Sequence, residues 1–248
     1  MKVFTHSDFL QVYAREPAAA AGRIESILSA ISNDVEFEDV FPAGEDDILA
    51  AHTKSHVQSI SRTKLFNVAA LAAGAAIQTA VAGMEAPSFG LIRPPGHHAS
   101  ADSCWVFCYF NNMAIAIEHL YSTGLIKKAH ILDFDMHYGD GTVNILGAKS
   151  YVSIHNPDQA NRMDYLKEVA SRLESIQADV IAVSAGFDNH VDDWGGTLRT
   201  EDYYEMGRMV NAAGRRMGAG SFALLEGGYN HDVLGKNVRE FLRGMEGS

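Results

Sequence analysis

Short, continuously apolar runs alternate with longer helical stretches along this chain. Such runs are typical of strands that are buried on both faces of a parallel sheet. Strands of this kind are predicted at residues 89–92, 130–134, 150–154, 180–184 and 221–225, with further short ones at Val3-Phe4 and 35–38. Helices are predicted at residues 64–83, 111–121, 164–176 and 201–216. The alternation predicts an α/β fold in which a mainly parallel sheet is covered by helices on both faces.

The length and the lack of a linker indicate one domain. A chain of 248 residues can bury a single substantial core, and no biased segment divides it, so residues 1–248 are expected to form one unit. The longest apolar stretch, Val68 to Gly83, is shorter than a membrane span and contains Gln78. Its Ala-rich composition favours a packed core helix instead.

The charge balance makes the chain acidic. Asp and Glu number 31 against 20 Lys and Arg, a net charge of -11, so the field repels nucleic acid and anionic membranes and favours cationic ligands. Neither nucleic acid nor a membrane is therefore expected as a partner. Two cysteines, Cys104 and Cys108, are too few for a zinc finger or a disulfide framework. The first residues show no secretory pattern, so a cytoplasmic location is expected.

Four of the predicted strands run directly into side chains that bind metals or transfer protons. These residues are His97, His98, Asp133, Asp135, His137, Asp140, Asp188 and Tyr229. In an open parallel sheet, ligands occupy the crevice beyond the carboxyl ends of the strands. The four clusters are therefore expected to meet at one site, and the chain is predicted to be a metal-dependent hydrolase.

Three of these residues form a candidate metal site. Asp135 and His137 are two positions apart, so in extended chain their side chains project from the same face. Asp188, at the end of another strand, is the best candidate for a third ligand, which would leave positions free for water and substrate. Two carboxylates and one neutral imidazole balance the charge of a divalent cation. The mixed nitrogen and oxygen set favours zinc, and iron(II) or cobalt(II) would fit the same ligands.

The tandem histidines His97 and His98 need hydrogen-bond partners if they are buried. Asp133 and Asp140 flank the metal ligands and are placed to accept one bond each, which fixes the tautomer of each imidazole and raises its basicity. Further along, Gly227-Gly228 precedes Tyr229, and two residues without side chains let the backbone approach a ligand closely.

The motifs between Arg93 and Tyr229 resemble those of the histone deacetylase superfamily, which includes acetylpolyamine amidohydrolases and acetoin-utilisation deacetylases. The resemblance implies an arginase-related parallel α/β fold and hydrolysis of an acetylated amine, either a small molecule or a peptide. It matches the three candidate ligands to the metal ligands of the family. It also implies that His98, backed by Asp140, is the general base and that His97, backed by Asp133, assists electrostatically.

The same resemblance assigns further roles. Tyr229 matches the catalytic tyrosine that stabilises the oxyanion, and Phe107 a wall of the substrate tunnel, while Gly227 and Gly228 border the substrate. The family also carries a structural monovalent cation, usually potassium. The positions that match its ligands are Asp133, Asp135, His137, Ser153 and Ile154.

The chain departs from the family pattern around the substrate tunnel. Val106 stands where the family commonly has glycine, and after Pro157 the family's long Gly-rich loop with its second wall aromatic is missing. The rim segment that follows His56 is also short. The pocket is therefore expected to be open, or to be completed by Trp194 or by a neighbouring subunit of a homo-oligomer.

Two other functions fit the same fold. A two-metal ureohydrolase of the arginase type needs a second Asp close to Asp188, and Asp188-Asn189-His190 does not supply it. A catalytically silent binding module would keep the fold without its substrate loops. The complete set of metal-binding, histidine and tyrosine residues argues against that alternative.

Overall fold

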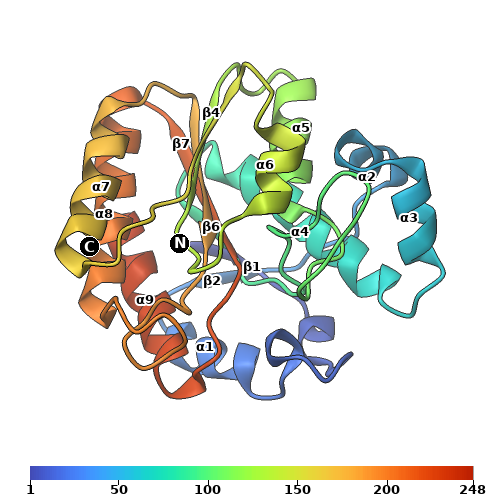
Figure 1. Cartoon of the computed structure of the whole chain (residues 1–248), viewed down its shortest axis with the longest axis horizontal. Coiled ribbons are helices and arrows are strands. Elements are labelled where there is room, and N and C mark those ends of the chain that lie inside the picture. Colours follow the sequence, from blue (N-terminus) through green and yellow to red (C-terminus); the bar gives the residue numbers. More distant parts are fainter. Residues whose placement is uncertain (248) are drawn as a thin grey trace.

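A single seven-stranded sheet organises the chain in a computed structural model, which describes residues 1–247 (Figure 1). The strands are β1 (Lys2–Phe4), β2 (Glu36–Glu38), β3 (Ser88–Gly90), β4 (Ala129–Asp133), β5 (Val152–His155), β6 (Val180–Ala185) and β7 (Gly220–Leu225). Their order across the sheet is β2-β1-β3-β7-β6-β4-β5, and every neighbouring pair is parallel. The predicted α/β fold with a parallel sheet is confirmed.

Helices cover both faces of this sheet, with α4, α5 and α6 on one side and α1, α7, α8 and α9 on the other (Figure 1). The α-helices are α1 (Arg23–Ile31), α2 (Glu45–Ala51), α3 (Lys54–Ser61), α4 (Phe66–Gly83), α5 (Asn112–Ser122), α6 (Asp140–Leu146), α7 (Arg162–Ser175), α8 (Thr200–Met217) and α9 (His231–Glu246). Two short 3-10 helices, η1 (Ser7–Leu10) and η2 (Pro17–Ala19), precede them.

The central strands show why a continuously apolar run is needed. Along β6, Val180 and Ala182 join the core beneath α4 and α5, whereas Ile181 and Val183 join the core beneath α7, α8 and α9. Successive side chains of a strand point to opposite faces, so a strand covered on both faces must be apolar at every position. The sheet therefore separates two hydrophobic cores.

The Ala-rich helix α4 is long and apolar enough to cross a membrane by length and composition, and 67% of it is buried within the fold. It packs against β3, β7 and α5. Gly74 allows the backbone around Phe41 to approach so closely that a Cβ atom there would collide with it. This arrangement agrees with the predicted core helix.

All the predicted strands and helices are present, with ends that differ by at most two residues. The prediction omits helices α1, α2, α3, α6 and α9. Helix α9 carries a clear amphipathic pattern, because Leu234, Val238, Phe241, Leu242 and Met245 are all buried on one face. Helix α9 could therefore have been predicted from the sequence.

The order of the strands positions the functional residues. Strands β3, β7, β6 and β4 are neighbours in the middle of the sheet, and the four predicted clusters follow these strands. Their carboxyl ends lie at one edge because the strands are parallel. Residues that are far apart in sequence are thereby brought to one place.

Candidate active site

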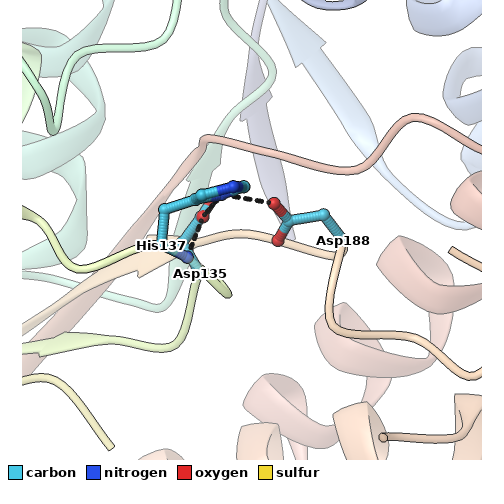
Figure 2. A group of neighbouring side chains, drawn as sticks. All are labelled: Asp135, His137 and Asp188. Atoms are coloured by element: carbon cyan, nitrogen blue, oxygen red, sulfur yellow. Dashed lines mark hydrogen bonds and ion pairs between the residues drawn. The ribbon is translucent and has the colours of Figure 1, made fainter. Parts of the chain in front are cut away.

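The candidate metal ligands Asp135, His137 and Asp188 lie together beyond β4 and β6, and Figure 2 shows their side chains converging. One potential ligand atom from each lies within 4.8 Å of those from the other two. The Nδ1 atom of His137 lies 3.2 Å from Oδ1 of Asp135 and 3.0 Å from Oδ2 of Asp188. The structure thus brings together the three residues that the sequence nominated.

The hydrogen bonds of the two carboxylates leave room for a cation. Asp135 accepts backbone N–H groups from His137 at 2.9 Å and Gly227 at 2.8 Å, and Asp188 Oδ1 accepts from Met136 at 3.0 Å. Oδ2 of Asp188 is buried, and its close polar neighbour is Nδ1 of His137. Two buried carboxylates that face one imidazole nitrogen fit a divalent cation.

The ionisation of these groups points the same way. Hydrogen bonds to Asp135 and Asp188 raise the pKa of His137 to about 10. Burial, together with the charge of Asp135, raises the pKa of Asp188 to about 6. The raised pKa of His137 reflects the negative charge of the two carboxylates, which a bound cation would also offset.

The tandem histidines each bond a different carboxylate. His97 Nδ1 lies 3.1 Å from Asp133 Oδ2, and His98 Nδ1 lies 2.6 Å from Asp140 Oδ1. Both imidazoles are buried, and their ring centroids are 4.1 Å apart. The expected pairing of each histidine with one aspartate is present in the structure.

The two histidines differ in their electrostatic surroundings. Burial disfavours the charged form of His97, but the nearby carboxylates of Asp135 and Asp133 outweigh it and raise its pKa well above the usual value. A cation bound to Asp135 would oppose this shift. Burial and the neighbouring His97 lower the pKa of His98. Such divergence between adjacent titratable groups is typical of an acid–base pair.

A buried glutamate supports the histidine segment. Glu226 Oε2 accepts the backbone N–H groups of Gly96 at 2.8 Å and His97 at 3.2 Å. Burial raises the pKa of Glu226 to about 7. Glu226 was not among the predicted site residues, because an acidic residue after a strand does not reveal which backbone it will bind.

Gly227 and Gly228 are used for close approach and for an unusual turn. A Cβ atom on Gly227 would lie 2.6 Å from Asp135 Oδ2 and 2.8 Å from Asp188 Oδ2. Gly228 has a φ of 113°, which side-chain-bearing residues rarely adopt. Gly227 therefore lies directly against the candidate metal ligands.

Tyr229 is held from three sides. Its backbone N–H donates to Asp193 Oδ2 at 2.8 Å, and its ring stacks on that of Trp194 with centroids 4.1 Å apart. Arg23, from α1, donates to the carbonyl of Gly228 at 2.8 Å and places its guanidinium 5.6 Å from the centre of the tyrosine ring. Arg23 and Asp193 were not among the predicted site residues, because nothing local in the sequence links them to this turn.

Aromatic side chains surround the mouth of the site. Trp194 lies 6.0 Å from His137 between ring centroids, and Phe107 lies 6.2 Å from Tyr229. The ring of Trp105 lies against that of His98, with centroids 4.6 Å apart, and its indole N–H donates to Asp140 Oδ2 at 2.9 Å. Trp105 was not among the predicted site residues. The available signal was that this large aromatic residue lies two positions before Phe107, the predicted wall of the substrate tunnel.

The backbone is strained at Val106 and Phe107. Val106 has a φ of 40° and Phe107 a φ of 65°, a region that disfavours branched side chains in particular. A glycine at position 106 would adopt this φ without strain. Valine in place of the usual glycine therefore carries a conformational cost.

The predicted potassium ligands come from β4, the loop after it and β5. Ser153 pairs with His130 in the sheet, and its hydroxyl lies 2.8 Å from His130 Nδ1. Ile154 pairs with Ile131. Both partners precede Asp133 along β4, and the potassium site stays a prediction.

Comparisons with known proteins agree with these motifs. A profile of the histone deacetylase domain matches residues 60–165 and 147–245. A probable deacetylase of Methanothermobacter thermautotrophicus is 32% identical over 285 positions, which cover 92% of this chain and 85% of that protein. The acetylpolyamine amidohydrolase of Mycoplana ramosa is 31% identical, and the match covers 64% of this chain and 57% of that protein.

A solved structure has the same fold. The HD domain of HDA15 superposes with a TM-score of 0.87 over 99% of this chain and 89% of that domain, at 21% sequence identity. The archaeal alignment has 285 positions, more than the 248 residues of this chain, so the relative carries residues with no counterpart here. The two profile matches overlap at residues 147–165, the segment in which the shortened loop was predicted. The extent of these matches, over most of the chain, shows that it belongs to the histone deacetylase family.

Proposed function

We propose that this chain hydrolyses the amide bond of an acetylated amine in a metal-dependent reaction. The observation that carries the proposal is the convergence of the Asp135, His137 and Asp188 cluster with two histidine–carboxylate pairs. Buried carboxylates and imidazoles are costly to a fold unless they are paired or bind a ligand. Family membership supports hydrolytic deacetylation.

Asp135, His137 and Asp188 are the proposed ligands of one divalent ion. Zinc suits this set of donors, and iron(II) and cobalt(II) are the alternatives. When bound, such an ion acts as a Lewis acid towards the amide carbonyl and lowers the pKa of a water molecule. Gly227 supports the site by donating its backbone N–H to Asp135.

His98 is the proposed general base. Asp140 accepts a hydrogen bond from Nδ1–H, so Nε2 is the atom that takes a proton from the attacking water. The lowered pKa of His98 keeps this nitrogen unprotonated near neutral pH. His97, bonded to Asp133, contributes electrostatic stabilisation, and the amine leaves after it has received a proton from a histidine.

Tyr229 is the proposed donor to the oxyanion that forms when the carbonyl is attacked. A phenol hydroxyl can donate a hydrogen bond to this charge only if the ring is held in place beforehand. Arg23, Asp193 and Trp194 provide that support through the backbone and the ring face.

The proposed substrates are acetylated amines of small molecules or peptides. The names of the relatives, a probable deacetylase and an acetylpolyamine amidohydrolase, support this class. The net charge of -11 favours the approach of an amine that carries further positive charge. The shortened loop predicted after Pro157 gives no support for a long, closed tunnel.

The test is hydrolysis of a substrate panel by zinc-loaded protein. Acetyl-lysine peptides, acetylpolyamines and short acyl-amides are compared with Tyr229→Phe as the matched variant. We expect wild-type protein to release acetate from at least one class and the variant to lose most of that activity. Metal binding without activity towards any member of the panel would favour a silent binding module.

One observation bears on the two-metal alternative. Within residues 1–247, one cluster of at least three histidine, cysteine, aspartate or glutamate side chains could hold an ion. It consists of Asp135, His137 and Asp188. A metal titration is therefore expected to end at one tightly bound ion per chain. An end point at two ions would favour a ureohydrolase-like reaction instead.

A further inference from the structure

Trp105 connects the rim of the site to the proposed general base. Its indole N–H donates to Asp140 Oδ2 at 2.9 Å, while the other oxygen of the same carboxylate lies 2.6 Å from His98 Nδ1. The indole ring also lies against the imidazole of His98, with centroids 4.6 Å apart and planes inclined by 46°. The tryptophan therefore contacts both members of the pair.

Asp140 needs this restraint because it is not buried. Its side chain is 40% exposed, whereas that of His98 is 4% exposed. An exposed carboxylate can rotate and exchange its partners with water, and a rotation would disturb the bond that orients the imidazole. A hydrogen bond from a neutral indole occupies the second oxygen without introducing a competing positive charge.

The surrounding backbone is built to hold the indole in place. His52 Nδ1 lies 3.0 Å from the carbonyl of Ser100, and His56 Nε2 lies 2.8 Å from the carbonyl of Tyr109. These contacts fix both ends of the segment that carries Trp105. The left-handed conformations at Val106 and Phe107 then turn the chain immediately after the indole.

From this geometry we infer that Trp105 is a positioning residue that holds Asp140, and through it His98, in the orientation required for proton transfer. The inference rests on the proposed deacetylase function and adds a residue to it. Because the tryptophan is also 55% exposed at the rim, a bound substrate would cover its outer surface and shield the hydrogen bond from water.

The hydrogen bond can be tested without measuring activity. The chain has two tryptophans, so a proton–nitrogen correlation spectrum of the zinc-loaded full-length protein should show two indole signals, which Trp105→Phe assigns. We expect the Trp105 signal to exchange slowly with water and to move upfield in Asp140→Asn. The Trp194 signal serves as the internal reference. The inference would be overturned if the Trp105 indole proton exchanged rapidly with water and its chemical shift were unchanged in Asp140→Asn.

The catalytic consequence is tested with the same variant. Trp105→Phe keeps an aromatic ring beside His98 but removes the N–H donor, so kcat should fall by about tenfold, as expected for loss of a hydrogen bond to a charged group. KM, zinc content and Tm should stay close to the wild-type values, since a purely structural role would change Tm and leave kcat intact. The control is Tyr121→Phe, whose ring stacks on Tyr151 at the opposite end of α5 and which should leave kcat unchanged.

The two proposals fail in different ways. If wild-type protein hydrolyses no acyl-amide, the proposed function fails, and the indole spectrum alone decides whether Trp105 holds Asp140. If wild-type protein is active and Trp105→Phe has an unchanged kcat, the positioning role is wrong and the proposed function stands.

Discussion

Replacing Gly227 with alanine is the most informative perturbation of the proposed metal site. A Cβ atom at this position would lie 2.6 Å from Asp135 Oδ2 and 2.8 Å from both Cγ and Oδ2 of Asp188. Ordinary van der Waals contacts of such an atom begin near 3.4 Å. The new methyl group must therefore push one or both carboxylates away by more than half an ångström, about 0.6–0.8 Å, against a close-packed interior.

The size of the effect follows from the tolerance of metal sites. Ligand distances in such sites vary by only about 0.2 Å, so a displacement of this size removes a ligand from its position. Changes that merely reorient a ligand lower metal affinity by about 10- to 100-fold, and Gly227→Ala is expected to reach at least that range. The free energy of unfolding of the metal-free protein should fall by about 1–3 kcal/mol because of the overpacking.

The assay is a competition titration of zinc against a chelator, with thermal unfolding recorded on the same samples. Gly44→Ala is the matched control, because its nearest new contact is Asp47 Oδ2 at 3.4 Å and its φ of -69° suits alanine. The control should bind zinc like the wild type. Wild-type zinc affinity in Gly227→Ala would refute the assignment of Asp135 and Asp188 as ligands of one ion.

Three further predictions concern the tyrosine, the arginine and a buried histidine. Tyr229→Phe should lower kcat by about 100- to 1000-fold with unchanged zinc affinity, and a loss below tenfold would exclude it as the oxyanion donor. Arg23→Met removes the donor to the Gly228 carbonyl, so urea unfolding should show a loss of about 2–4 kcal/mol, and a loss under about 1 kcal/mol would contradict this role. Burial lowers the pKa of His52 from 6.5 to about 4, so the unfolded chain takes up a proton more readily and stability is lost as the pH falls from 6.5 towards 4. The loss should approach about 3 kcal/mol and should shrink in His52→Gln; an unchanged acid sensitivity in that variant would disprove the assignment.

The proximity of the candidate ligands could be predicted from the sequence because these residues follow buried strands directly. Asp135 and Asp188 could be placed together without knowing any contact, since parallel strands end at the same edge of the sheet. That each tandem histidine bonds one carboxylate followed from the need of a buried imidazole for a partner, whereas the resemblance to the family implied the specific pairing of His98 with Asp140.

Features that depend on long-range geometry were not predictable in this way. Arg23 reaches Tyr229 from the first helix, and no local pattern in the sequence announces that contact. The pairing of Ser153 with His130 depends on the register between β4 and β5, which no motif in the sequence reveals. The contact between Trp105 and Asp140 joins residues 35 positions apart, and the backbone that follows the indole, at Val106 and Phe107, is unusual.

Zinc titration of chelator-treated protein, with bound metal and acetate release followed together, tests the central claim most directly. The account predicts that the apoprotein is inactive, that activity rises to a plateau at one bound ion per chain, and that Asp188→Asn shifts this plateau to much higher zinc concentration. Full activity of the apoprotein, or an Asp188→Asn variant that responds to zinc like the wild type, would contradict it.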